Sequence, residues 1–261
     1  MINDYFNGIF KNKYILFSLV NRDLIQKYRR SILGIAWSII TPLGLAIIIG
    51  AVYSLLFSTD PEVLIPLLFA GLNPWNFIAG TAESGTYSFI AAEGYIKQST
   101  VSAQIFPLRT AMTNFVNLLY SIITYFAIYL FLEPTLFGPK MLLVIPGLFI
   151  VFIFALGLAN VTSIITLHLR DYQPFQSLIL QGLFYVTPII FPVNELINKG
   201  GKWIVLLNPF YYMLEIVRMP MIGIEIPSLQ IYLVAIIISL LTFLTSIKIV
   251  MKYKNVIAYK L

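Results

Sequence analysis

Long runs without charged residues are the feature that most constrains how this chain can fold. No charged side chain occurs between Arg30 and Asp60, and similar apolar runs recur along the rest of the sequence. A helix of about 20 apolar residues crosses the roughly 30 Å hydrocarbon core of a bilayer. Such runs must be helical, because backbone amides that face lipid can bond only within their own segment. The sequence therefore predicts an all-α integral membrane protein.

Six of these runs are predicted to be transmembrane helices within a single transmembrane domain, 1–261. They cover residues 32–57, 63–89, 109–132, 141–167, 173–193 and 226–248, and the fifth is broken near its end by Pro188 and Pro192. Only 11% of the residues are charged, whereas a soluble domain carries roughly 25%. The polar N-terminus is followed by no small-residue cleavage site, so a removable signal peptide is not expected.

The basic residues predict the orientation of these spans. If the N-terminus is cytoplasmic, 13 of the 17 Lys and Arg residues fall in cytoplasmic segments. The outer loops then hold only Lys140, Lys199, Lys202 and Arg218. Because cytoplasmic loops are enriched in Lys and Arg, both termini are predicted to be cytoplasmic. The net charge of +6 is explained in the same way, and no nucleic-acid partner is expected.

Residues 14–30 have the pattern of an amphipathic helix at the membrane interface. Leu16, Val20, Leu24 and Tyr28 share one side at helical spacing, and the basic residues gather largely away from it. Asp23 and Lys27 are spaced for an i,i+4 ion pair. Such a basic helix lies on the membrane instead of crossing it. The alternative is an ordinary flank that fixes topology.

The segment 195–222 is apolar but is not predicted to cross the membrane. Asn208-Pro209 divides it and Pro220 closes it, so each half is too short for a span. Counting it as a span would place the basic C-terminal tail outside, against the charge pattern. We therefore predict two short re-entrant helices, covered by protein where their backbone is not helical.

The sequence contains none of the motifs that carry ATP hydrolysis or metal chemistry. Gly200-Gly201-Lys202 lacks the spacing of a phosphate-binding loop. The single histidine, His168, cannot build a metal site alone and is interpreted as a residue that caps a helix or lies at the interface. Glu83 is the one acid well inside an apolar run, either near the water boundary or lining a pathway. No enzyme activity, cofactor or metal is predicted for the chain.

Aromatic side chains make up 15% of the sequence, and some lie deep within the predicted spans. The candidates for lining a channel, together with Glu83, are Tyr53, Phe69, Trp75, Phe77, Phe184 and Tyr185. Aromatic faces stack on the apolar faces of sugar rings and offer few strong hydrogen bonds, which suits a sliding polymer. The alternative for each residue is packing against lipid or other helices.

Several short motifs occur in the order of a known family. They are Arg22-Asp23-Leu24, Tyr28-Arg29-Arg30-Ser31-Ile32-Leu33-Gly34 with Trp37, Thr41 and Pro42, Gly71-Leu72 with Pro74-Trp75, Phe106-Pro107 with Arg109, Arg170-Asp171, Thr187-Pro188-Ile189 and Asn208-Pro209. In these motifs the chain resembles the permease subunit of ABC-2 type polysaccharide exporters, which move O-antigen, capsule or teichoic acid chains. The resemblance covers nearly the whole sequence.

The resemblance implies six spans per subunit, a homodimer and two copies of a separate ATPase subunit that binds ATP and Mg. It implies a gate for substrate entry at Arg22, Lys27, Tyr28, Arg29, Arg30 and Trp37. It implies contact with the ATPase through a coupling segment, 93–104, with Glu93, Tyr95 and Lys97, and through the turn at Arg170 and Asp171. The helices of 195–222 are then the outer gate. One departure is Leu108, which separates Pro107 from Arg109 and puts the register of the coupling segment in doubt.

The function expected from this resemblance is ATP-driven export of a polyprenyl-pyrophosphate-linked polysaccharide across the bacterial cytoplasmic membrane. Lys27, Arg29 and Arg30 are suited to attract the anionic pyrophosphate; the alternative is that they contact phospholipid headgroups. Two other functions stay open. One is an ABC-2 permease for a lipid or drug, and the other is a membrane glycosyltransferase or scaffold that works without ATP.

Overall fold

The computed structural model describes residues 1–29, 31–57, 60–132, 134, 137–191 and 193–261. Within these ranges every regular element is a helix and no strand occurs. In chain order the elements are α1 (Ile2–Lys11), α2 (Lys13–Tyr28), η1 (Gly34–Ala36), α3 (Trp37–Phe57), α4 (Pro61–Tyr87), η2 (Ile90–Ala92), α5 (Glu93–Gln98), α6 (Ile105–Leu132), η4 (Pro139–Leu143), α7 (Val144–His168), α8 (Tyr172–Val186), α9 (Val193–Asn198), α10 (Lys202–Leu207), α11 (Pro209–Ile222), α12 (Leu229–Tyr253) and α13 (Ile257–Lys260).

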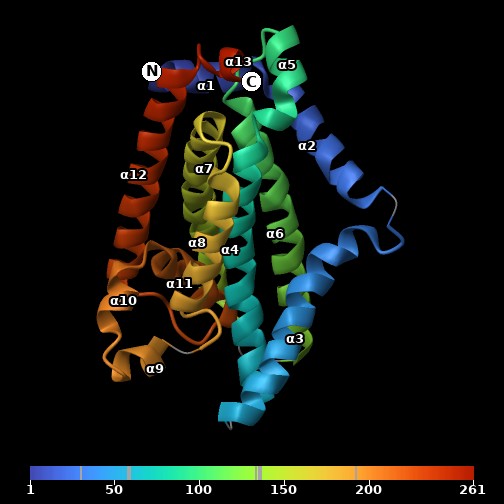
Figure 1. Ribbon diagram of the computed structural model, residues 1–261. Coiled ribbons are helices and arrows are strands. Elements are labelled where there is room, and N and C mark those ends of the chain that lie inside the picture. The colour runs from blue at the N-terminus through green and yellow to red at the C-terminus, as the bar shows by residue number, and fades with distance from the viewer. Residues whose placement is uncertain (30, 58–59, 133, 135–136, 192) are drawn as a thin grey trace.

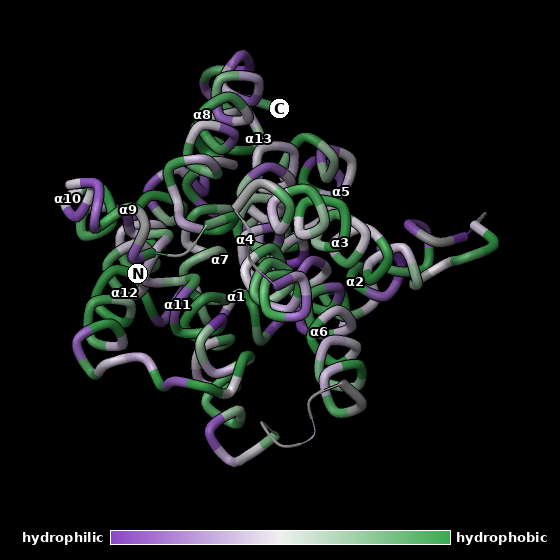
Figure 2. The backbone as a smooth tube through the Cα atoms, turned by 90° about the horizontal axis from the view of Figure 1, so that it is seen from below, coloured by the Kyte–Doolittle hydropathy of each residue, from purple (hydrophilic) through white to green (hydrophobic). Residues whose placement is uncertain are grey.

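The long helices form a bundle with two distinct ends. Both chain termini lie at one end of the bundle, together with α1, α5 and α13 (Figure 1). The opposite end carries α9, the end of α3 and the start of α4. Viewed from that opposite end, hydrophobic residues predominate along the long helices around the bundle (Figure 2).

Among the described residues, five helices are long and apolar enough to cross a membrane. They are α3, α4, α6, α7 with the preceding η4, and α12. Each begins and ends within a few residues of a predicted span. The start of α4 shows why: Asp60 accepts a hydrogen bond from the backbone N–H of Glu62 at 2.9 Å, and Pro61 occupies the first helical position. This capping by Asp and Pro is typical of a helix N-terminus.

The helix within the predicted span 173–193 covers only the first part of that span. Helix α8 has only 15 residues and ends at Val186, which at 1.5 Å per residue is about 22 Å. Thr187 has an extended backbone (φ −82°, ψ 133°), because a residue before proline is disfavoured in the helical region. Pro188 therefore ends the helix short of the length that a complete span needs.

Helix α4 is the centre of the bundle. It is the most buried of the five candidate spans. In α4, 61% of the most apolar 18-residue stretch is buried, compared with 22% in α3. It packs against α3, α6, α7, α8 and α11. The main hydrophobic core forms around it, with Leu68, Ile78 and Met213 fully or almost fully buried. Because α3 is largely uncovered, its apolar surface is left for lipid or for another subunit.

A second hydrophobic cluster holds the N-terminal helices against the bundle. It joins Tyr5 of α1 and Leu16 of α2 to Phe106 of α6 and Val250 of α12. Helix α1 was not predicted, since the segment has only ten residues and mixes polar with apolar ones. The predicted interface helix 14–30 corresponds to α2, which starts at Lys13 and ends at Tyr28. Its apolar residues are not confined to one side, because Phe17 and Ile25 are exposed.

The predicted re-entrant segment contains three helices, α9, α10 and α11, instead of two. The additional helix, α9, begins at Val193 before the predicted segment. Asn208 and Pro209 separate α10 from α11, and the Asn208 side chain accepts a hydrogen bond from the N–H of Phe210 at 3.0 Å. Helix α11 packs against α4, α7 and α12, so other helices of the bundle cover it.

Candidate functional site

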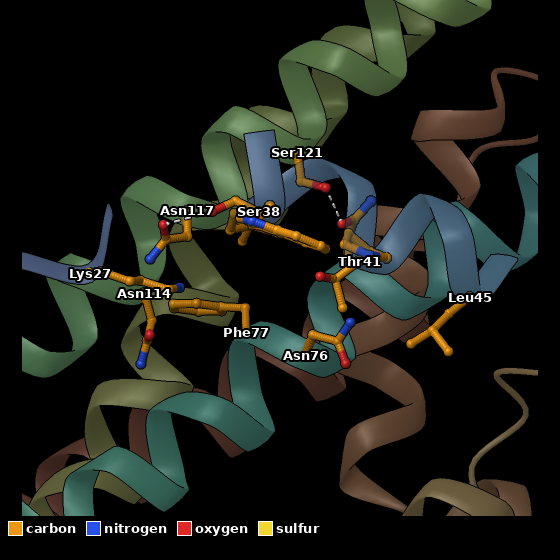
Figure 3. Close-up of a pocket in the computed structure, with 13 residues that line it drawn as sticks. Lys27, Ser38, Thr41, Leu45, Asn76, Phe77, Asn114, Asn117 and Ser121 are labelled. Atoms are coloured by element: carbon orange, nitrogen blue, oxygen red, sulfur yellow. Dashed lines mark hydrogen bonds between the residues drawn. The ribbon is translucent and has the colours of Figure 1, made fainter. Parts of the chain in front are cut away.

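A polar pocket lies between α3, α4 and α6, next to the end of α2. Its volume is about 350 Å³, and Figure 3 shows side chains from these helices around it. The lining residues are Lys27, Trp37, Ser38, Thr41, Pro42, Leu45, Asn73, Asn76, Phe77, Asn114, Asn117, Leu118 and Ser121. Most of them belong to segments that are apolar enough to cross a membrane. Polar side chains at such depth are costly and usually serve a function.

The polar lining comes from pairs of residues spaced three apart on three helices. Helix α3 supplies Ser38 and Thr41, α4 supplies Asn73 and Asn76, and α6 supplies Asn114 and Asn117. Residues three apart in an α-helix lie on the same face, so each pair presents both side chains in one direction. The three helix faces meet at the pocket.

Hydrogen bonds fix several of these amides in place. The Asn117 Nδ2 group donates to the Thr113 carbonyl at 2.9 Å, and its Oδ1 accepts from Ser38 Oγ at 3.1 Å. Asn73 donates to the Phe69 carbonyl at 2.9 Å and accepts from Ser121 (Figure 3).

Other amides keep capacity for a ligand. Asn114 donates to Ser84 Oγ at 2.8 Å, and Asn76 is exposed within the pocket. Amides and hydroxyls both donate and accept hydrogen bonds. The lining can therefore bind a neutral, hydroxyl-rich group.

The mouth of this pocket is basic. A second cavity of about 460 Å³ adjoins it and is lined by Gln26, Lys27, Arg29 and Ser31. Lys27 lines both cavities, and Arg29 is exposed. Cations at a membrane surface attract phosphate groups and bind them with charge-assisted hydrogen bonds. The two cavities together place basic side chains next to a lining that is otherwise polar and uncharged.

The structure distributes the predicted entry residues over two places. Lys27, Arg29 and Trp37 line the cavities, and Trp37 Nε1 donates to Ser31 Oγ at 3.1 Å. Arg22 instead faces α5, where its Nη1 donates to Tyr95 Oη at 2.8 Å. Arg30 and the Tyr28 side chain lie outside the described residues. Where the sequence predicts an Asp23–Lys27 pair, the structure pairs Asp23 with Arg109 of α6.

The predicted channel aromatics are also dispersed. Phe77 lines the pocket, whereas Phe69 and Trp75 are buried in the main core, with Trp75 between Phe184 and Phe210 at centroid distances of 5.7 and 5.5 Å. Tyr53 is partly buried against the core, and Tyr185 is 70% exposed. Glu83 accepts a hydrogen bond from Ser177 Oγ at 3.2 Å, one turn before α4 ends.

Helix α5 carries the predicted coupling residues on an exposed surface. It spans Glu93–Gln98, and residues 99–104 of the predicted segment are not helical. Lys97 forms an ion pair with Glu93 at 2.6 Å. The hydrogen bond and charge of Lys97 lower the pKa of Glu93, and the charge of Arg170 adds to this shift. Arg170, next to Asp171 in the α7–α8 connection, therefore lies on the same surface as α5.

Comparison with known proteins identifies the family. The model of the ABC-2 type transporter family matches residues 14–222 of this chain. The chain belongs to the ABC-2 type transporter family. Two O-antigen export system permeases RfbA from Klebsiella pneumoniae are 29% and 30% identical to it over 201 residues. A third RfbA, from Myxococcus xanthus, is 26% identical over 212 residues. Each alignment covers 77% of both chains.

This ABC-2 permease is a membrane subunit and is not itself catalytic. Among the described residues, no three His, Asp or Glu side chains are placed to hold a metal ion. His168 ends α7, with its Nδ1 2.9 Å from the Ile164 carbonyl and its ring against Tyr253. It therefore occupies the helix-end position that the sequence predicts.

The asparagines of the pocket were missed by sequence reasoning about the permease. The site residues were predicted from charged and aromatic side chains, so single amides within the apolar runs were not considered. Their spacing was the available signal, because Asn73 with Asn76 and Asn114 with Asn117 each occupy one helix face. Only the packing of α3, α4 and α6 shows that the two faces converge.

Proposed function

We propose that this permease exports a polysaccharide linked to a polyprenyl pyrophosphate across the bacterial cytoplasmic membrane, driven by a separate ATPase. The observation that carries the proposal is the pocket with a basic mouth and an amide-lined interior. The pyrophosphate carries the negative charge of such a substrate, and sugar hydroxyls form its neutral part. The relatives that match most of the chain are O-antigen export permeases.

The order of groups along the pocket matches the order of groups in the substrate. Lys27 and Arg29 lie at the entrance, where they can receive a pyrophosphate that stays at headgroup level. Trp37 and Phe77 lie within the amide-lined pocket and offer faces for sugar rings. A hydroxyl-rich group that leaves water needs hydrogen-bonding partners, and the pocket amides supply them.

Six crossings per subunit are part of the proposal. Both termini lie at the same end of the bundle (Figure 1), which requires an even number of crossings, and five helices are long enough individually. Helix α8 and residues 187–191 supply the sixth crossing. The short helix is tolerated because protein covers its non-helical end: Ile189 is fully buried. The distribution of basic residues supports a cytoplasmic position for the end with α1 and α5.

The ATPase is proposed to bind at α5 and the α7–α8 connection. No residue of α5 is buried, and Arg170 and Asp171 are exposed beside it. This surface carries charges of both signs and lies at the end proposed to be cytoplasmic. Two permease copies and two ATPase copies, with ATP and Mg bound by the ATPase, complete the proposed transporter.

The proposal is tested by producing the permease with an ATPase encoded beside it and reconstituting the complex in vesicles. We expect a lipid-linked polysaccharide to stimulate ATP hydrolysis and to become accessible to a glycosidase on the opposite side. The control is a complex whose ATPase carries a substitution that abolishes hydrolysis. If the complex forms and hydrolyses ATP but moves no lipid-linked polymer, the proposed cargo is wrong.

A small cargo is the alternative that one observation favours. The pocket volume of about 350 Å³ is within the range of small-molecule sites, about 300–1,000 Å³. An ABC-2 permease for a lipid or drug would use the pocket as the whole binding site. In the same vesicles, such a permease responds to a free lipid or hydrophobic amine, whereas a polysaccharide exporter requires the glycan.

A further inference from the structure

One side-chain contact connects α2, which carries the basic mouth, to the exposed helix α5. Arg22 Nη1 donates a hydrogen bond to Tyr95 Oη at 2.8 Å. The guanidinium carbon also lies 5.6 Å from the centre of the Tyr95 ring, within the range of a cation–π interaction. The Arg22 Nε atom is buried without a hydrogen-bond partner, whereas the hydrogen bond from Nη1 to Tyr95 lies on the exposed surface.

The Tyr95 ring has a defined position on the other side of this contact. It packs against Phe106 with the ring centroids 6.4 Å apart, and Phe106 is only 1% exposed at the start of α6. No residue of α5 is buried, and besides Tyr95 the helix is held mainly by Ile96, which packs against the second hydrophobic cluster, and by α13. A displacement of α5 therefore moves the Tyr95 ring, and with it the hydrogen-bond acceptor of Arg22.

The residue after Arg22 fixes α2 to a different helix. Both carboxylate oxygens of Asp23 accept from Arg109 of α6, one of them from Nε at 2.5 Å. This ion pair is largely shielded, with side-chain exposures of 13% and 19%. Asp23 gives α2 a fixed point on the bundle, and Lys27 follows one turn later on the same side. A force on Arg22 therefore tilts or rotates α2 about Asp23 and shifts Lys27 at the mouth.

We infer that the Arg22–Tyr95 contact transmits movement of α5 to α2 and thereby opens and closes the basic mouth of the pocket. Arg22 and Tyr95 are positioning residues, since they act through α2 and not on the cargo. The inference rests on the proposed function, in which a separate ATPase displaces α5. It adds a route by which ATP hydrolysis controls admission of the cargo.

Conservative variants of the two residues test this route. Tyr95→Phe keeps the ring and removes the hydroxyl acceptor, and Arg22→Lys keeps the charge but loses the planar, multiple-donor group. The matched control is Tyr87→Phe, because Tyr87 is a similarly exposed tyrosine whose hydroxyl bonds to Gln173 of α8. The reconstituted complex is measured for ATP hydrolysed and for polymer moved per ATP.

We expect each test variant to lower the polymer moved per ATP by about three- to tenfold, the range that one hydrogen bond represents, while ATP hydrolysis stays near the wild-type rate. The double variant should lose no more than the larger single effect, because both substitutions break the same contact. Tyr87→Phe should leave the ratio unchanged.

A reporter at the mouth separates transmission from simple destabilisation. The permease has no cysteine, so Gln26→Cys provides its one thiol in the second cavity. ATP should change the rate at which an impermeant maleimide modifies this thiol, and Tyr95→Phe should abolish that change. Variants that couple ATP to movement as well as the wild type would overturn the inference. A wild-type complex that moves no polymer would instead overturn the proposed function, while the ATP-dependent maleimide rate would still test the contact.

Discussion

Glu215 and Arg218 form an ion pair in the interior of the permease, although Arg218 was predicted to lie in an outer loop. Each side chain is only 4% exposed, and the two are three residues apart on α11. Arg218 Nη1 also donates to the Pro188 carbonyl at 2.6 Å. Arg218 thus satisfies a carbonyl just beyond the end of α8, where the helix has stopped hydrogen-bonding to itself.

Arg218→Met should destabilise the permease by about 3–5 kcal/mol, because it leaves Glu215 buried without a cation and Pro188 without its donor. The double variant Glu215→Gln/Arg218→Met should recover part of the loss, since no buried charge remains. The measurement is the thermal unfolding midpoint in detergent. Lys97→Met serves as control, because its ion pair with Glu93 is exposed and contributes little. Unfolding of Arg218→Met at the wild-type temperature would show that the pair does not stabilise the fold.

The two asparagines of α4 should respond differently to substitution by leucine. Asn76 is exposed within the pocket, so Asn76→Leu should preserve the unfolding temperature but reduce transport several-fold if the amides bind the cargo. Asn73 is 3% exposed and bonded to both Phe69 and Ser121, so Asn73→Leu should lower the unfolding temperature. Transport and unfolding are measured on the same preparations. Equal transport by Asn76→Leu and wild type would remove the pocket from the transport path.

At the scale of elements, α1 is attached to the bundle through polar contacts of a buried tyrosine. Tyr5 is fully buried, its hydroxyl accepts from Asn160 Nδ2 of α7 at 3.1 Å, and its carbonyl accepts from Gln104 at 3.1 Å. Asn160 also donates to Ser246 of α12. Helix α1 is therefore joined at one point to α7 and to the loop that follows α5.

Burial raises the pKa of Tyr5 to about 12, with a smaller opposing effect of the Asn160 hydrogen bond. A tyrosine in the unfolded chain loses its proton near pH 10. The stability contributed by neutral Tyr5 is therefore complete below about pH 10 and is lost as the pH rises towards 12. Relative to Tyr5→Phe, the wild type should lose about 3 kcal/mol over this interval. Unfolding midpoints from pH 8 to 12 provide the measurement, and parallel curves for the two proteins would contradict the assignment.

Some helices of the permease could be predicted from the sequence and others could not. The five long helices were predictable because uncharged runs between Asp, Lys and Arg residues mark the bilayer core and its boundaries. The end of α8 at Val186 agrees with the break expected at Pro188, although the apolar run itself continues to Phe191. Helix α1 was missed although Ile2, Tyr5, Phe6 and Ile9 have helical spacing, because its ten residues are too few to cross a membrane and were not searched for an amphipathic pattern.

The candidate site was also predicted only in part. The basic residues at the mouth were predicted from their local clustering, and α2 was predicted nearly in full. The pocket interior was not predicted, because it exists only where the faces of α3, α4 and α6 meet. Trp75, a candidate for lining a channel, packs in the core between Phe184 and Phe210. Ring packing there stabilises the bundle.

At the scale of the whole molecule, the number of crossings decides where the outer helices lie. With a cytoplasmic N-terminus, crossings by α3, α4, α6 and α7 return the chain to the cytoplasm before α8. If α8 and residues 187–191 cross, α9 is outside and α12 brings the C-terminus back inside. If they do not cross, α9 is cytoplasmic and the C-terminus is outside. The two arrangements therefore differ at α9 and at the C-terminus simultaneously.

Single cysteines in this cysteine-free chain distinguish these arrangements. Exposed positions are available at Asn3, Glu62, Gly94, Asn198 and Tyr259. In spheroplasts, an impermeant maleimide should label Glu62→Cys and Asn198→Cys, whereas the other three should react only after permeabilisation. The unmodified chain is the control for background labelling. Protection of Asn198→Cys together with labelling of Tyr259→Cys would mean five crossings. That result would contradict the shared end of the termini in Figure 1, because an odd number of crossings separates them.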